Sequence, residues 1–165
     1  MINIYLDNLN KNFGEWVELP LQADELEAVK KDLCYGEDEI IITAFEAPDH
    51  LAISEFDNLD CLNELAEKLD TLDRWDLDKW VAMIEYEGGG ADRALDLLDR
   101  IDDVYLIDAN NYYDLGYEIL TETYDIDREV PEPFNNYIDF EAYGRDLILS
   151  GEFTFTSKGA LHYCY

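Results

Sequence analysis

The chain has 165 residues, of which 40 are Asp or Glu and 11 are Lys or Arg, so its formal net charge is −29. Apolar residues make up 48% of it, which excludes the acidic sequences that stay unfolded for want of hydrophobic surface. No apolar run approaches the length of a membrane span, and residues 1–6 lack the basic and apolar regions of a secretory signal. We therefore expect a folded cytoplasmic protein that carries its charge on a fixed surface.

The density of negative charge approaches that of a nucleic acid. Duplex DNA carries roughly one charge per ~1.7 Å of its axis, so a charge of −29 corresponds to roughly 15 base pairs. Such a charge repels itself and disfavours a compact sphere, which predicts an elongated chain with several small cores. The alternative is that the acidity only maintains solubility, as in salt-adapted proteins, but the scarcity of Lys and Arg argues against it.

The first predicted domain, residues 1–60, combines strands with one helix. Residues 2–6 alternate between apolar and polar side chains, which predicts a half-buried strand, and residues 16–19 predict a second. The run 40–45 is β-branched and apolar on both faces, which predicts a central strand. Between the last two strands, Asp24 and a reciprocal acid three residues later have the spacing of a helix N-cap, so a short helix is expected there. The expected acidic partner of this cap is Glu27.

Helices dominate the second predicted domain, residues 61–103. Leucines recur at helical spacing over residues 59–72, and residues 76–86 continue with an apolar helix face. A run of glycines at 88–90 breaks the pattern, and a further helix is predicted over 94–101. The three tryptophans, Trp16, Trp75 and Trp80, are interpreted as anchors of the cores.

The third predicted domain, residues 104–165, returns to a mixed pattern. Residues 104–107 predict a strand, and the next helix carries tyrosines on one face, from Tyr113 to Tyr124, and acids on the other. A helix is predicted over 140–149, and alternating aromatic residues from Phe153 onward predict a terminal hairpin. The fold class that follows is α+β, with three small domains along the chain.

Rows of carboxylates follow the predicted helices at intervals of three and four residues. Residues four apart rise about 6 Å along a helix, a pitch similar to that of successive phosphates on a DNA strand. Like charges at this spacing destabilise a helix slightly, and an ordinary solvated face would mix the signs. A solvated face remains the alternative for any single helix, but the rows recur. Their members are Asp57, Asp60, Glu64, Glu67, Asp92, Asp96, Asp99, Asp103, Asp114, Glu118, Glu122 and Asp125.

Motifs for other chemistry are weak. The cysteines Cys34, Cys61 and Cys164 form no metal-binding spacing with either histidine, so we expect reduced thiols and neither a metal site nor a cofactor. No Ser or Cys is arranged with a histidine as a catalytic nucleophile. Among 40 carboxylates some pair will always lie at the separation used for acid–base catalysis, so such a pair does not indicate an enzyme. We therefore expect a binding protein, while an enzyme that uses carboxylate catalysis stays open as a rival.

The C-terminal part of the chain carries a distinctive signature. Residues 136–147 read Asn-Tyr-Ile-Asp-Phe-Glu-Ala-Tyr-Gly-Arg-Asp-Leu, with Glu-Val-Pro before them at 129–131 and Ser-Gly-Glu-Phe after them at 150–153. Near the start, Ile-Tyr-Leu at 4–6 is followed by Gly-Glu-Trp at 14–16. These segments resemble the ArdA antirestriction proteins, and the length and extreme acidity agree with that family.

The resemblance implies a function and a partner. ArdA proteins are cytoplasmic DNA mimics, commonly encoded on mobile elements, that occupy the DNA-binding groove of type I restriction-modification enzymes. They are curved, elongated homodimers of three small domains. The resemblance therefore implies an antirestriction protein that binds both the methyltransferase core and the whole complex. It makes Tyr105, Tyr112 and Tyr113 candidates for the dimer interface, and Asp108, Asp114, Glu118 and Glu122 candidates for mimic charges.

The expected mechanism needs neither catalysis, nor a membrane, nor direct contact with nucleic acid. Carboxylates would accept hydrogen bonds from the Arg and Lys side chains that otherwise bind phosphate. Arg145, one of few cations in the signature, is expected to hold Asp or Glu side chains within the last domain. An acidic chaperone, or an inhibitor of other basic nucleic-acid-binding proteins, is the alternative function.

Overall fold

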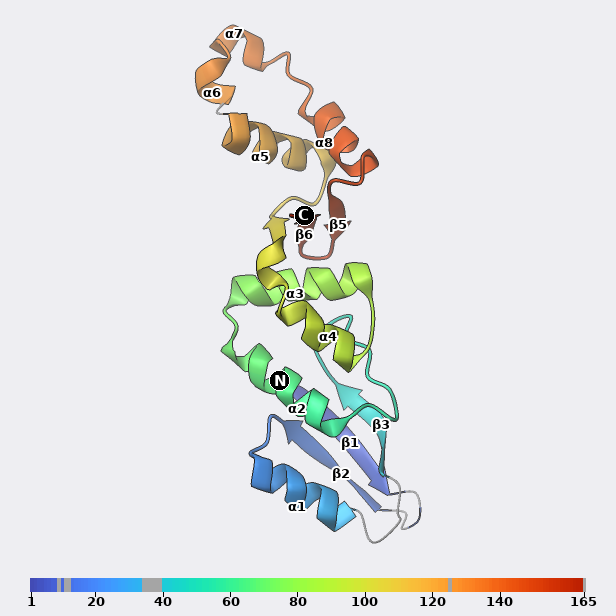
Figure 1. Cartoon of the computed structure of the whole chain (residues 1–165). Coiled ribbons are helices and arrows are strands. Elements are labelled where there is room, and N and C mark those ends of the chain that lie inside the picture. Colours follow the sequence, from blue (N-terminus) through green and yellow to red (C-terminus); the bar gives the residue numbers. More distant parts are fainter. Residues whose placement is uncertain (9, 11–12, 34–39, 125, 165) are drawn as a thin grey trace. The chain divides into compact units, whose positions relative to one another are not determined.

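A computed structural model of the chain is α+β, as predicted, with two small antiparallel sheets (Figure 1). It describes residues 1–8, 10, 13–33, 40–124 and 126–164. Close contacts between Cα atoms divide the chain into two units, Met1–Leu77 with Glu87–Asp99 and Asp78–Tyr86 with Arg100–Tyr165. The expected three domains, 1–60, 61–103 and 104–165, and the elongated shape stay predictions.

The first unit is built on a three-stranded sheet in the order β2-β1-β3, with strands Phe13–Leu19, Ile2–Asn8 and Ile40–Glu46 (Figure 1). The central strand is therefore β1, whose Ile2, Ile4 and Leu6 are buried in strict alternation. The prediction that residues 40–45 form the central strand is wrong, because β3 is an edge strand of the described sheet and Phe45 is exposed. Apolar residues at the end of an edge strand produce the same sequence pattern as a buried strand.

Helix α1, Ala23–Leu33, packs beside this sheet and buries Leu26 and Leu33. Its start differs from the prediction by two residues. The Gln22 N–H donates to Glu25 Oε2 at 3.1 Å, and the Leu26 N–H donates to the Gln22 carbonyl at 2.9 Å. The acidic residue that completes the cap is thus Glu25 rather than Glu27, because the helix begins before Asp24.

Three helices follow: α2 at Leu59–Thr71, α3 at Arg74–Glu87 and α4 at Ala91–Leu98. The predicted leucine stripe of α2 is buried at Leu62, Leu65 and Leu69, and in α3 the side chain of Trp80 is fully buried. Trp16 and Trp75 are about half exposed, so the expectation that they anchor cores is wrong. The prediction that α4 continues to Ile101 is also wrong, because Asp99 caps it and residues Ile101–Asp103 form a separate 3-10 turn.

The second unit holds a sheet in the order β4-β6-β5, with strands Val104–Ile107, Gly159–Tyr163 and Thr154–Thr156. The predicted terminal hairpin is confirmed. Helices α5 at Tyr112–Tyr124 and α8 at Phe140–Leu149 pack against each other (Figure 1). Two single-turn helices, α6 at Ile126–Glu129 and α7 at Glu132–Asn135, lie between them in the sequence. The core comprises Ile107, Ala109, Leu115, Leu147, Phe153 and Ala160.

Two glycines set the distance between α5 and α8. A Cβ atom added to Gly116 would overlap the Phe140 carbonyl, and one added to Gly144 would overlap the Tyr112 carbonyl. Both positions are buried, and each helix backbone lies directly against the other. The buried face of α5 is accordingly Leu115 and Gly116, and its tyrosine-rich face remains largely exposed.

Candidate functional site

The acidic row of α2 is exposed and lies where helical spacing predicts. Asp60, Glu64 and Glu67 all project from the helix surface opposite the buried leucines. Asp57 does not belong to the helix, because Asn58 is the N-cap and accepts a hydrogen bond from the Asp60 N–H at 2.8 Å. The Asp57 carboxylate is half-buried and accepts from the Ser54 N–H at 2.9 Å instead.

The next predicted row is divided by the end of α4. Asp92 and Asp96 lie exposed on the helix, and Asp99 is its C-cap. Asp103 is exposed in the 3-10 turn and belongs to the second unit. The structure therefore places these four acids on three local elements, and only the first two share a helix face.

In the second unit, α5 carries Asp114 and Glu122 exposed and Glu118 half-exposed, while Asp108 is exposed after β4. Asp114 takes part in the helix N-cap, because the Asp114 N–H donates to Asn111 Oδ1 at 2.9 Å and Asn111 Nδ2 donates to Asp114 Oδ2 at 2.6 Å. Asp125, the last predicted member of this row, lies outside the described residues.

Ion pairs within the chain occupy several of these carboxylates. Lys30 lies 2.6 Å from Asp60 and 3.0 Å from Glu27, and Lys68 lies 3.3 Å from Glu64 and 3.6 Å from Asp99. Arg100 lies 3.8 Å from Asp103. The hydrogen bond to Asp60 raises the pKa of Lys30, and the hydrogen bond to Glu64 raises the pKa of Lys68. Exposed pairs of this kind contribute little stability, yet they neutralise charge locally.

Nine of the candidate acids divide into two classes. We call Asp60, Glu64, Asp99 and Asp103 the paired acids, since each faces a Lys or Arg side chain. We call Glu67, Asp96, Asp108, Glu118 and Glu122 the open acids, since their carboxylates have no ion-pair or hydrogen-bond partner among the described residues. Sequence spacing indicates the local pairs of Lys68 with Glu64 and of Arg100 with Asp103. It does not indicate the pairs of Asp60 with Lys30 and of Asp99 with Lys68, which join different elements.

The tyrosines predicted for an interface are exposed on the second unit. Tyr105, Tyr112 and Tyr113 have 54%, 37% and 51% of their surface exposed. The Tyr113 ring stacks on Tyr117 with centroids 6.4 Å apart, and both rings meet Phe140 edge-on at 5.6 and 5.3 Å. Tyr117 and Phe140 were not predicted as interface residues, although Tyr117 has the i+4 spacing to Tyr113 that brings side chains together on a helix.

The family model of the antirestriction protein ArdA matches residues 8–162. The chain belongs to the ArdA family. No individual curated protein matches it. The resemblance seen at residues 129–153 is confirmed by this match, and it identifies an antirestriction protein, which belongs to a family of inhibitors rather than of enzymes.

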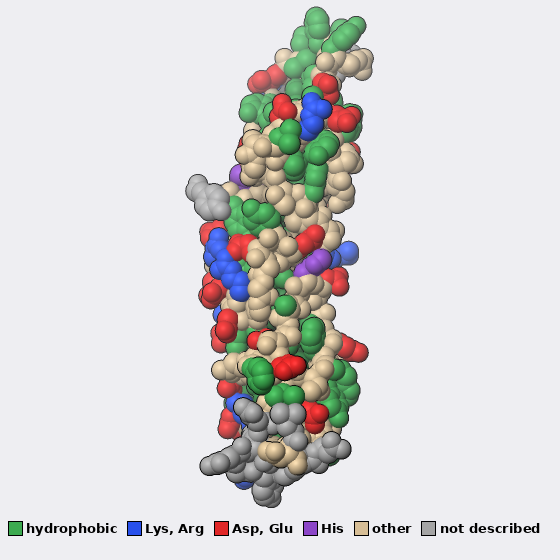
Figure 2. All heavy atoms as spheres, turned by 90° about the vertical axis from the view of Figure 1, so that its right-hand side faces the viewer, with side chains coloured by type: hydrophobic (Ala, Val, Ile, Leu, Met, Phe, Trp, Pro, Cys, Tyr) green, Lys and Arg blue, Asp and Glu red, His purple; other side chains and the backbone are tan. Residues whose placement is uncertain are grey.

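Figure 2 shows one face of this ArdA-family chain, on which Asp and Glu side chains are more frequent than Lys and Arg. On this face the Lys and Arg side chains have Asp or Glu side chains near them. Arg145 does not behave as predicted. It is exposed on α8 and makes no ion pair with any described side chain, so it does not hold acids in place within this unit.

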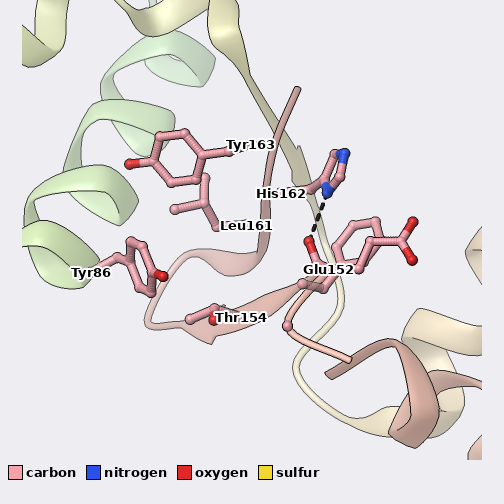
Figure 3. Close-up of a pocket in the computed structure, with 8 residues that line it drawn as sticks. Tyr86, Glu152, Thr154, Leu161, His162 and Tyr163 are labelled. Carbon is pink, nitrogen blue, oxygen red and sulfur yellow. Dashed lines mark hydrogen bonds between the residues drawn. The ribbon is translucent and has the colours of Figure 1, made fainter. Parts of the chain in front are cut away.

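A small hollow of the ArdA fold lies beside the terminal hairpin (Figure 3). Its volume is about 150 Å³, and it is lined by Tyr86, Leu161, His162 and Tyr163, among others. His162 Nδ1 lies 2.7 Å from the Glu152 carbonyl oxygen. Pockets for small-molecule ligands usually measure about 300–1,000 Å³, so this hollow is below that range.

Metal sites and membrane-spanning helices are absent from the parts of the chain that the structure describes. Within these parts, no group of three or more His, Cys, Asp or Glu side chains is placed to hold a metal ion. None of the helices described is both long and apolar enough to span a membrane. The carboxylates and tyrosines on the surface are therefore the side chains from which a function for this ArdA protein is argued.

The two described cysteines should differ strongly in reactivity. Burial raises the pKa of the Cys61 thiol to about 12, and the hydrogen bond with Asp92 and the surrounding carboxylates act in the same direction. Cys164 is exposed. At pH 8.5, we expect iodoacetamide to alkylate Cys164 at least about tenfold faster than Cys61, because only the thiolate reacts. Peptide mass spectrometry in a Cys34→Ser background measures both rates, and equal rates would contradict the assignment.

The same shift predicts a loss of stability in alkali. A group whose pKa is raised by folding stabilises the fold fully below its ordinary value, here 9.0, and this contribution is lost as the pH rises toward about 12. Cys61→Ser should remove that part of the alkaline decline in the free energy of unfolding.

Proposed function

We propose that this ArdA-family protein inhibits type I restriction-modification enzymes by occupying their DNA-binding groove. Its open acids, Glu67, Asp96, Asp108, Glu118 and Glu122, take the place of phosphate oxygens and accept hydrogen bonds from Arg and Lys. The paired acids take part only after their internal cations are exchanged for those of the enzyme. The protein acts in the cytoplasm and contacts no nucleic acid itself.

The observation that carries the proposal is the exposure of carboxylates at phosphate-like intervals on a chain of net charge −29. Within α5, Glu118 and Glu122 lie four residues apart, which corresponds to about 6 Å along the helix. Phosphate contacts supply the sequence-independent part of DNA affinity, so a surface that copies only phosphates competes with DNA of any sequence. The antirestriction function of the family agrees with this mechanism.

A competition experiment tests the proposal. A fluorescent duplex is bound to a purified methyltransferase core of a type I enzyme, and the protein is added at low salt. We expect complete displacement of duplexes with and without the target sequence, and the same result with the whole restriction complex. A stable ternary complex that retains the duplex would contradict occupation of the groove. Free basic chromosomal proteins serve as the comparison, because an acidic chaperone would bind them at least as tightly.

We further propose that the protein is a homodimer whose interface includes Tyr105, Tyr112 and Tyr113. The stacked Tyr113 and Tyr117 rings form an exposed aromatic surface on the second unit. Tyrosine is enriched at interfaces because its apolar ring tolerates water at the hydroxyl end.

Tyr113→Asp is expected to convert the dimer to a monomer without a change in circular dichroism. Multi-angle light scattering measures the mass. Tyr86→Asp, at another exposed tyrosine of the same unit, is the matched control and should leave the mass unchanged. A monomeric wild-type protein would rule out the proposed interface.

A further inference from the structure

The first unit exposes an aromatic pair on the outer face of its sheet. Tyr5 of β1 lies opposite Trp16 of β2, and their ring centroids are 5.5 Å apart with an interplanar angle of 68°. Strand alternation places both rings on the face away from the buried Ile2, Ile4 and Leu6. Trp16 is 54% exposed, although a tryptophan is usually largely buried.

The pair is held in place by the backbone beneath it. A Cβ atom at Gly14 would come within 2.7 Å of the Tyr5 ring and 2.6 Å of the Leu6 carbonyl oxygen. The Tyr5 ring therefore lies across the strand at Gly14, and Trp16 packs edge-on against it. An aromatic surface that is already ordered loses little conformational entropy when a partner binds.

The surroundings of the pair determine the charge of that partner. Besides the two rings, the described positions in register on this face hold Asn3, Asp7, Gly14, Glu18, Ile41, Ala44 and Glu46, and none of them is Lys or Arg. Asn3 Nδ2 donates to Glu46 Oε2 at 3.3 Å, and Glu18 lies opposite Asn3 in the strand register. The carboxylates repel a nucleic acid and a second copy of the same face, but they attract a cation.

We propose that the Tyr5–Trp16 pair binds an arginine side chain of the restriction-modification enzyme, beside the contacts made by the phosphate-mimicking acids. A guanidinium group stacks on tryptophan and tyrosine rings, and carboxylates at the rim accept its hydrogen bonds. Tryptophan, tyrosine and arginine are also the residues that most often dominate interface energetics. This inference rests on the proposed function, and it adds a contact that has no counterpart in a DNA backbone.

The contact differs from phosphate mimicry in its response to salt. Carboxylate contacts weaken as salt rises, whereas stacking on aromatic rings is much less sensitive. Titration calorimetry with a type I methyltransferase core over a salt series separates the carboxylate contacts from the aromatic stacking. Trp16→Ala should weaken binding about tenfold at every salt concentration with an unchanged slope. Glu67→Gln should weaken binding at low salt and reduce the slope.

Trp75→Ala is the matched control, because Trp75 is 47% exposed in the same unit and makes no ring contact with any described residue. Its affinity should stay within about twofold of wild type. Trp16→Phe keeps an aromatic ring beside Tyr5, and its affinity for the methyltransferase core should be about threefold lower than that of wild type. This variant tests the inference even if the alanine variant is unstable. Equal affinities for Trp16→Ala, Trp16→Phe and wild type would overturn the inference. If wild type itself fails to displace DNA, the proposed function fails instead.

Discussion

Gly144→Ala is expected to destabilise the second unit by about 3 kcal/mol or more, because overpacking against backbone has no side chain that can move aside. The new Cβ would overlap the Tyr112 carbonyl on α5, and the neighbouring Gly116 amide also lies at that crossing. Both α5 and α8 would have to separate, which would open the core at Leu115 and Leu147. For a unit of this size the melting temperature should fall by about 15 °C.

Gly90→Ala serves as the control for the glycine experiment. A Cβ atom there would be 3.8 Å from the nearest atom, the Ala52 carbonyl oxygen, and the backbone φ of −90° suits any residue. Calorimetry should show a change of less than about 1 kcal/mol, the usual range for an N-cap substitution. If the Gly144→Ala and Gly90→Ala variants have the same melting temperature, the described approach of α5 to α8 is incorrect.

The second large effect is expected from removing the open acids. Glu67→Gln, Asp96→Asn, Glu118→Gln and Glu122→Gln, combined in one variant, should weaken inhibition of a type I enzyme at least about a hundredfold at low salt. Each hydrogen bond between charged groups is worth about 1.5–3 kcal/mol when its partner is buried on binding, and these effects are not fully additive. The measurement is the concentration that halves DNA cleavage.

The matched control removes the same number of charges from the paired acids, with Asp60→Asn, Glu64→Gln, Asp99→Asn and Asp103→Asn. Their cations already neutralise them in the free protein, so inhibition should weaken about tenfold or less. Equal losses in the two variants would mean that only net charge matters and that the position of the carboxylates does not.

Much of the fold could be predicted because local patterns specify it. The alternation around Ile4, the leucines of α2 and the terminal hairpin each depend on neighbouring residues, and each was confirmed. Relations between distant segments could not be predicted in this way. The edge position of β3 depends on which strand pairs with β1, and the exposed tyrosine face of α5 depends on its contact with α8 at Gly144.

The acidic surface was predictable in part for the same reason. Helical spacing placed Glu64 and Glu67 correctly, and the i+4 position of Lys68 also indicates its pair with Glu64, whereas the contact of Lys68 with Asp99 is tertiary. Lys30 reaches Asp60 across 30 positions of sequence, so this pairing is a tertiary contact. Trp16 was expected in a core because tryptophan usually packs there, whereas its place in β2 leaves 54% of it exposed.

The central claim is that fixed carboxylates replace phosphates in a basic groove. Its most direct test is the equilibrium constant for binding to a DNA-free methyltransferase core, measured from about 50 mM to 500 mM salt, beside the same series for a duplex of roughly 15 base pairs. We predict that the logarithm of the binding constant falls linearly with the logarithm of the salt concentration, with a slope comparable to that of the duplex. Binding that is equally tight across the whole series would contradict the claim.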